Sequence, residues 1–404
     1  MSISILYHTQ NIVGYTYIRT IYKEGACIFK IHPQERLLCC PICGNREVQS
    51  RGSVQRDILL LPTGHHKNYA QVDIPRVYCS RCDKLRQIRL GFAEEHHSCS
   101  RLFERYVCDL CKVMTILDVA QHLDISWSTV KDIHKRHLDK KYKTPSLKNL
   151  HKIAVDEISC GKGHKYLTIV LDLENGAVVF VGEGKGAEAL EPFWARLGRR
   201  KKKIQSVAVD MSPAYTKAVR ENLPEATLVY DHFHVIKLYN EKLSEYRRLL
   251  YRETEDADMK ALLKGTRWLL LKNRENLKEE KKEWERLEAA LSANRPLLTA
   301  YYLKEELHRI WEQPDMSRGV EVFDEWVKMA EISGVGMLVR FAQTLRAHRE
   351  GILNYYKSRI TTAALEGTNT KIRVLQRRAY GYRDQDYLKL RILALHEGNF
   401  QKIV

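Results

Sequence analysis

The hydrophobic pattern of the first half of the chain changes from strand-like to helical near residue 100. Strand-like stretches run from Ser53 to Leu61 and from Gln71 to Tyr78, with Pro62–Gly64 between them as a turn. From Phe103 onward, apolar residues recur every three or four positions, which indicates helices. The pattern predicts a small β-ribbon followed by a helical segment.

The helical segment divides into three short helices. Apolar spacing places the first from Phe103 and the second from Ile116 to Leu123, and Asp124–Ser126 follows as a turn. Ser126 can cap a third helix, from Trp127 to about Leu138. This arrangement predicts a helix-turn-helix, whose recognition helix presents its first residues to DNA bases; a three-helix packing unit is the alternative. The candidate DNA contacts are Trp127, Ser128, Thr129, Lys131 and Lys135.

Strands and helices alternate after the polar link at residues 140–148. Apolar strands are predicted at His151–Ser159, Lys165–Asp172, Ala177–Gly182, Ile204–Val209 and Thr227–Tyr230, with an amphipathic helix at about Ala187–Leu197. This order is that of an RNase H-like core, a mixed sheet whose adjacent central strands bring acidic residues to one edge. The predicted fold class is therefore α/β and multidomain, with the ribbon and the helix-turn-helix in front of that core.

A long helical stretch interrupts this core. Residues 236–356 are rich in Lys, Arg, Glu and Leu, and the stretch is too long for a loop in a compact core, so it predicts a helical insertion. Within it, Trp268 could stack on a DNA base, although a tryptophan in the core is the commoner case. The predicted domains are a ribbon at 1–98, a helix-turn-helix at 99–145 and a catalytic domain at 150–404 with its insertion at about 236–356.

The charge of the chain favours a polyanionic partner. Lys and Arg number 67 against 50 Asp and Glu, a formal net charge of +17, and nucleic acid is the first candidate. The sequence has no apolar run of about 18 residues, and its start lacks the pattern of a secretion signal. We therefore expect a cytoplasmic protein without a membrane partner.

Two C-x2-C pairs predict a metal site in the ribbon. Cys40 and Cys43 form the first pair and Cys79 and Cys82 the second, and four thiolates complete a closed tetrahedral site for structural zinc. Reduced cysteines in a small core are the alternative. Cys39 stands beside Cys40, so the sequence leaves open which of the two is the ligand.

The remaining cysteines do not suggest a secreted, disulfide-linked protein. All ten lie between Cys27 and Cys160, and the rest of the chain has none. Cys108 and Cys111 are three residues apart in a helical pattern and share one face, so we predict that they pack in a core.

Two acidic residues occupy strand positions in the predicted core. Asp156 interrupts an apolar strand, and Asp210 ends the strand at Ile204–Val209. Displacement at a phosphodiester uses two divalent ions, for which carboxylates are the natural ligands. An acid among apolar residues is costly unless it faces a cation or a hydrogen-bond donor. Asp156 and Asp210 are thus candidate metal ligands; capping of a neighbouring loop is the alternative.

Several longer motifs occur in a fixed order along the chain. They are Cys40-Pro-Ile-Cys43-Gly, Arg-Val-Tyr-Cys79-Ser-Arg-Cys82, Val155-Asp156-Glu157 with Gly163-His164-Lys-Tyr166, Val-Asp210-Met-Ser-Pro-Ala-Tyr215, Asp231-His-Phe-His234, Leu365-Glu366-Gly-Thr-Asn369-Thr-Lys371-Ile and Arg378-Ala-Tyr380-Gly-Tyr382. With these motifs the chain resembles, nearly end to end, the ISL3 insertion-sequence family of bacterial DDE transposases.

The resemblance implies a catalytic site and a reaction. Asp156, Asp210 and Glu366 would form the DDE triad and bind Mg2+ or Mn2+. Asp231 and His234 resemble an acid-x-x-His signature near such sites, with a capped helix and a half-buried histidine as the alternative reading. The implied protein binds the terminal inverted repeats of its element in double-stranded DNA, cleaves them and joins the 3′ hydroxyl to a target, as a homodimer or larger assembly. The alternatives are a catalytically inactive DNA-binding regulator derived from a transposase, and a nuclease that only hydrolyses.

The segment around Glu366 has helical character from Ile360 to Leu375. Asn369 and Arg373 follow Glu366 by three and seven residues and fall on its face, as suits a metal beside a phosphate backbone. An ordinary solvated helix face would look similar. The candidate DNA contacts here are Asn369, Lys371, Arg373, Arg377 and Arg378.

Overall fold

A computed structural model of the chain describes residues 5–161 and 165–398, so Gly163 and His164 of the motifs lie outside the described residues. The chain forms two compact units, Met1–Lys143 and Thr144–Val404. The first unit holds the predicted ribbon and helix-turn-helix segments, and the second holds the predicted catalytic segment.

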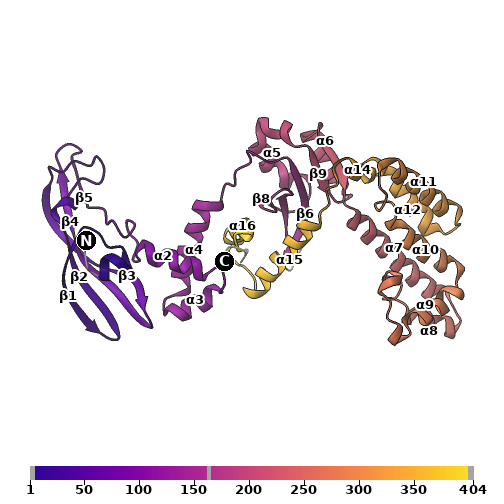
Figure 1. Cartoon of the computed structure of the whole chain (residues 1–404), viewed down its shortest axis with the longest axis horizontal. Helices are drawn as coiled ribbons and strands as arrows, with labels where there is room; N and C mark the ends of the chain where they lie inside the picture. Colours follow the sequence, from indigo (N-terminus) through magenta and orange to yellow (C-terminus); the bar gives the residue numbers. More distant parts are fainter. Residues whose placement is uncertain (1–4, 162–164, 399–404) are drawn as a thin grey trace. The chain divides into compact units, whose positions relative to one another are not determined.

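The first unit begins with a five-stranded sheet (Figure 1). Its elements are α1 (Ile5–Gln10), β1 (Tyr15–Lys23), β2 (Ala26–Pro33), η1 (Glu35–Leu37), β3 (Gln49–Thr63), β4 (His66–Cys79) and β5 (Lys84–Gln87). The strand order is β1-β2-β4-β3, and β5 pairs with β4. The predicted hairpin is confirmed as β3 and β4, which are longer than expected because Thr63 still pairs with His66 across the turn. Strands β1, β2 and β5 were not predicted.

Three helices complete the first unit: α2 (Arg101–Leu110), α3 (Ile116–Leu123) and α4 (Trp127–Tyr142). Ser126 caps α4 by accepting a hydrogen bond from the Thr129 amide, as predicted. Helix α4 runs one turn beyond the predicted end at Leu138, because Tyr142 lies four residues later on the same face and is also buried. Cys108 and Cys111 are buried in the core of these helices, which confirms the packing prediction.

The second unit is built on a mixed sheet. Its strands are β6 (Lys152–Gly161), β7 (Lys165–Asp172), β8 (Val178–Glu183), β9 (Ser206–Val209) and β10 (Thr227–Tyr230), in the order β10-β9-β6-β7-β8. Strands β6, β7 and β8 are antiparallel neighbours, whereas β6, β9 and β10 are parallel. The predicted RNase H-like order of strands is confirmed.

Helices cover both faces of this sheet. They are η2 (Ala187–Leu190), α5 (Glu191–Leu197), η3 (Gly198–Lys203), α6 (Pro213–Asn222), α15 (Ala363–Arg378), α16 (Gln385–Leu393) and η6 (Leu395–Gly398). On β6, Asp156 bonds to Asn369 of α15, and the next residue, Glu157, bonds to Tyr215 of α6. Because successive side chains of a strand point to opposite faces, α15 and α6 lie on opposite faces of β6.

The predicted helical insertion follows β10 and precedes α15 along the chain, and its helices α7 to α12 are labelled in Figure 1. It consists of α7 (His232–Glu253), α8 (Ala257–Gly265), η4 (Arg274–Asn276), η5 (Glu279–Lys281), α9 (Glu283–Ser292), α10 (Arg295–His308), α11 (Met316–Ile332), α12 (Gly336–Ala347), α13 (Arg349–Leu353) and α14 (Tyr355–Ser358). Helix α7 begins directly after β10, so the sheet and the insertion share one segment of backbone.

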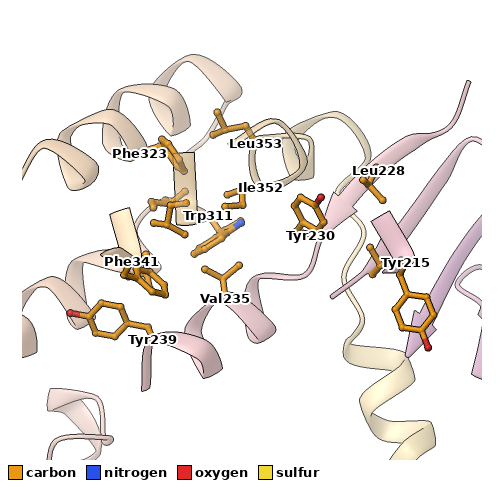
Figure 2. Close-up of a cluster of buried hydrophobic side chains, with 14 of the residues drawn as sticks. Tyr215, Leu228, Tyr230, Val235, Tyr239, Trp311, Phe323, Phe341, Ile352 and Leu353 are labelled. Carbon is orange, nitrogen blue, oxygen red and sulfur yellow. The ribbon is translucent and has the colours of Figure 1, made fainter. Parts of the chain in front are cut away.

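One hydrophobic core joins the sheet to the insertion (Figure 2). Tyr230, at the end of β10, packs close to Gly351 of α13, where an added Cβ would lie 2.3 Å from the tyrosine ring. Farther along α7, the ring of Tyr239 meets Phe341 edge to face, with 4.9 Å between centroids. The end of β10 is therefore fixed by packing from the insertion side, just before Asp231.

Candidate active site and metal centre

Three aspartates share one register just beyond the paired segments of the parallel strands. Ala154 of β6 pairs with Ala208 of β9, and the same offset leads from Asp156 to Asp210. The amide of Asp231, which follows β10, donates to the carbonyl of Val209, directly before Asp210. Since parallel strands end at one edge of a sheet, the topology gathers these carboxylates there.

Each oxygen of the Asp156 carboxylate accepts one hydrogen bond. Oδ1 accepts from the Glu157 amide at 2.7 Å, and Oδ2 accepts from Asn369 Nδ2, also at 2.7 Å. Burial raises the pKa of Asp156, and the negative charge of Asp210 adds to the effect, whereas these hydrogen bonds and the charge of His234 oppose it. The site thus holds two carboxylates whose mutual repulsion a cation would relieve.

Asp231 is buried, with 1% of its surface exposed, and its carboxylate accepts several hydrogen bonds. Its Oδ2 accepts from Thr362 Oγ1 at 2.6 Å and from His234 Nδ1 at 3.1 Å, and its Oδ1 accepts from the Thr362 amide at 3.2 Å. Burial raises the pKa of Asp231, but these hydrogen bonds outweigh it and lower the pKa overall. The contacts of the Asp231 carboxylate that the structure shows are therefore with Thr362 and His234 inside the protein.

His234 is hydrogen-bonded to Asp231 and lies close enough to Asp156 and Asp210 to be affected by their charge. Its side chain is 21% exposed, so it remains accessible. Burial lowers its pKa, but the hydrogen bond to Asp231 and the charges of Asp156, Asp231 and Asp210 together raise it. His234 is thus a histidine oriented by one carboxylate and influenced by the charge of two others.

Helix α15 carries the remaining candidates. Glu366 is exposed, one turn beyond Thr362 and one turn before Asn369. Lys371, Arg373, Arg377 and Arg378 are exposed as well. Asn369 is 3% exposed and lies against Asp156, so its expected role as a surface DNA contact does not fit; the helix turns this residue toward β6 instead.

The oxygens of Asp156, Asp210 and Glu366 do not converge in this structure. Within residues 5–161 and 165–398, one group of three or more potential ligands has all its ligand atoms within 4.8 Å of one another, and that group is the four cysteines. The donor set of the three carboxylates still suits hard divalent cations, which take oxygen ligands.

The cysteine cluster has the dimensions of a zinc centre. Cys40 Sγ lies 3.9 Å from Cys82 Sγ, and Cys43 Sγ lies 3.7 Å from Cys79 Sγ. A tetrahedral site with zinc–sulfur bonds of about 2.3 Å would separate its sulfurs by about 3.8 Å. The spacing of the four sulfurs, all within 4.8 Å of one another, therefore suits a tetrahedral zinc ion.

The structure also distinguishes Cys40 from the adjacent Cys39 as a potential zinc ligand. Cys40 belongs to the cluster and Cys39 does not. Hydrogen bonds from the backbone amides of Cys43 and Ile42 lower the pKa of Cys40 to about 6, whereas the hydrogen bond with Cys43 is the main cause that raises the pKa of Cys82 to about 12. Hydrogen bonds from the backbone thus favour the thiolate form of Cys40.

The helix-turn-helix presents part of its predicted contact face. At the start of α4, Trp127 and Ser128 are exposed, while Thr129, Lys131 and Lys135 are half-buried. The turn before α4 is made by Asp124 in the left-handed conformation, with φ of 50°. An aspartate tolerates this conformation better than most residues do.

Trp268 is exposed by 65%, so the core position considered for it is not observed. The guanidinium of Arg267 lies 4.6 Å from the centroid of its ring. An exposed aromatic ring beside a cation is the combination that single-stranded nucleic acid binds by stacking and charge.

Sequence reasoning missed Thr362. It lies outside every motif that the sequence analysis used, and its partner Asp231 is 131 residues away, so no local pattern connects them. Its position just before α15 was the one available signal, because Thr and Ser favour helix starts.

None of the helices in the described part of the chain is long and apolar enough to span a bilayer.

Comparison with known families gives three matches along the chain. A zinc-finger of transposases IS204/IS1001/IS1096/IS1165 matches residues 36–82, and the helix-turn-helix domain of transposase family ISL3 matches residues 88–138. The ISL3 transposase domain matches residues 153–392, more than half of the chain.

Individual relatives agree with these matches. The chain is 32% identical to the transposase for insertion sequence element IS1001 of Bordetella parapertussis over 374 residues, 91% of each chain. It is 27% identical to the transposase for element IS1557 of Mycobacterium tuberculosis, covering 92% of this chain and 89% of the relative. A solved Drosophila P element transposase strand transfer complex aligns with 74% of this chain and 91% of that one, at 12% identity and a TM-score of 0.38.

The order of the strands, the zinc-ribbon and helix-turn-helix matches and the length of the alignment to IS1001 all agree. The chain belongs to the ISL3 family of DDE transposases, enzymes that cleave DNA and transfer its strands.

Proposed function

We propose that this transposase binds the terminal inverted repeats of a bacterial insertion sequence, cleaves them and joins the freed 3′ hydroxyl to target DNA. The observation that carries the proposal is the common register of Asp156 and Asp210 just beyond the paired segment of the adjacent parallel strands β6 and β9, with α15 bonded to Asp156. The family to which the chain belongs indicates the chemistry that such carboxylates perform.

Asp156, Asp210 and Glu366 would hold the divalent ions, Mg2+ or Mn2+. The ions would supply charge stabilisation for the attacking and leaving oxygens. The residues of the chain fix where this happens: Asn369 and the Glu157 amide hold Asp156, and Asp231 orients His234. Asp231 serves as a positioning residue, and His234 is the group placed to contact the scissile strand.

The first unit would locate the element ends. Trp127 and Ser128 at the exposed start of α4 would meet bases, with Thr129, Lys131 and Lys135 beside them. Zinc at the four cysteines would staple the end of the β3–β4 hairpin. In the second unit, Trp268 and the exposed basic residues of α15 would contact DNA near the cleaved strand.

Because two ends must be brought together, we expect a homodimer or larger assembly on DNA. We test the whole proposal with a strand-transfer assay on the flanking element ends in Mg2+, comparing the wild type with Glu366→Gln. Joined product from the wild type alone supports the proposal. Binding without product from either protein favours a DNA-binding regulator, and cutting without joining favours a nuclease.

A further inference from the structure

We infer that Asn369 is a positioning residue of the divalent-metal site, holding Asp156 through its amide nitrogen and carrying an unpaired amide oxygen beside that carboxylate. The inference rests on the proposed function, because it takes Asp156 as a metal ligand. It gives Asn369 a role in metal affinity rather than in contact with DNA.

The orientation of the Asn369 amide follows from its partner. An ionised carboxylate only accepts hydrogen bonds, so the group 2.7 Å from Asp156 Oδ2 must be Nδ2. The amide oxygen, Oδ1, then points elsewhere. It is buried and has no hydrogen-bond partner within the described structure. Such an acceptor is unusual, because buried polar atoms are normally paired.

Asn369 cannot easily turn away from the strand. It sits on α15 between Leu365 and Ile372, both fully buried, which anchor this face of the helix. Seven residues earlier, Thr362 ties the chain to Asp231. The amide is therefore held on a rigid element, as a group that orients a ligand must be.

The Asp156 carboxylate retains room for a cation. Each of its oxygens accepts one hydrogen bond, and a carboxylate offers about four lone-pair positions. Partners that orient metal ligands in this way typically contribute about 10- to 100-fold to metal affinity. The unpaired oxygen of Asn369 adds a donor of the type that Mg2+ and Mn2+ prefer.

A purely structural hydrogen bond between α15 and β6 would give a different result. Its loss would lower the melting temperature but would leave the affinity for metal in the folded protein unchanged. Metal affinity, measured without DNA, therefore separates the two roles.

The experiment measures Mn2+ binding to the zinc-loaded full-length protein by electron paramagnetic resonance, with the double variant Asp156→Asn/Asp210→Asn as background. Asn369→Leu removes both polar atoms of the amide while keeping the number of side-chain heavy atoms and the branching at Cγ, and it should raise the Mn2+ concentration for half-saturation by about 10- to 100-fold. Asn369→Gln keeps both groups and should recover part of that affinity. Thr370→Val, on the exposed next position, is the matched control and should bind as the wild type does.

Unchanged Mn2+ affinity in a folded Asn369→Leu protein overturns the inference. If that variant does not fold, Asn369→Ser is measured in the same way, and its result decides. Wild-type protein that binds no Mn2+ above the background of the double variant overturns the proposed catalytic site as well. The two failures are thus told apart by the wild type alone.

Discussion

Thr362 donates two hydrogen bonds to the buried carboxylate of Asp231, from Oγ1 at 2.6 Å and from its amide at 3.2 Å. The chain leaves the sheet for the insertion directly after Asp231 and returns to it at Thr362. The pair therefore closes the insertion at its base. It also fixes the start of α15, one turn before Glu366.

We predict that Thr362→Val weakens both stability and activity. The variant keeps the shape of the side chain but removes a hydrogen bond to a charged group, which costs about 1.5–3 kcal/mol. Thermal melting and strand transfer are measured together, with Thr370→Val as the exposed control on the same helix. Wild-type melting and activity in Thr362→Val would show that the hydrogen bond from Thr362 Oγ1 to Asp231 is dispensable.

Asp156→Asn should retain binding to the element ends and lose cleavage. The amide is nearly isosteric but cannot supply the charge that a metal requires. The rate should fall by more than the roughly 100-fold that follows loss of a hydrogen-bond partner of a metal ligand. Gel-shift and cleavage assays in Mg2+ measure the two properties.

Glu157→Gln is the control for that prediction. Glu157 is the adjacent acid but faces the other side of the sheet, where Tyr215 donates to it at 2.7 Å, and a glutamine still offers an acceptor. It should cleave at close to the wild-type rate. Mg2+-dependent cutting by Asp156→Asn at the rate of Glu157→Gln would remove Asp156 from the metal site.

The sequence predicted those elements that have a clear local pattern of apolar and polar residues. The strands Lys165–Asp172 and Thr227–Tyr230 have the predicted bounds, because each is a short apolar run with polar ends. Strands β1 and β2 escaped prediction, since most of their side chains are exposed or half-buried and show no clear alternation.

The site was predictable only in part, for a physical reason. Asp156 and Asp210 stood out as acids at strand positions, which is a local signal. The contacts of Asn369 with Asp156 and of Thr362 with Asp231 join residues 213 and 131 positions apart, and only the fold brings them together. Glu366 is an exposed acid on a helix, so its local pattern resembles any solvated helix face.

The two adjacent cysteines of the ribbon should respond differently to substitution. Cys40→Ser removes one of the four clustered sulfurs and should reduce bound zinc well below one equivalent, whereas Cys39→Ser should retain one equivalent. Elemental analysis of the purified proteins measures the stoichiometry. Equal zinc content in the two variants would contradict the assignment of Cys40 as a ligand.

Trp268→Ala should weaken DNA binding without loss of stability. The ring is 65% exposed, so its removal should change stability by no more than about 0.5 kcal/mol. Stacking of an aromatic ring on an unpaired base contributes about 1–3 kcal/mol, which corresponds to a loss in affinity of about 5- to 150-fold. Tryptophan fluorescence quenching and gel shifts with element ends that carry a single-stranded flank measure the affinity.

Trp326→Ala should show the opposite pattern and serves as the comparison. Trp326 is 1% exposed, and its Nε1 donates to the carbonyl of Leu303 at 2.8 Å in the core of the insertion. Its removal should cost about 3–5 kcal/mol of stability. If Trp268→Ala binds flanked ends as tightly as the wild type, the exposed ring does not stack on DNA, and the basic face of α15 must hold the strand without it.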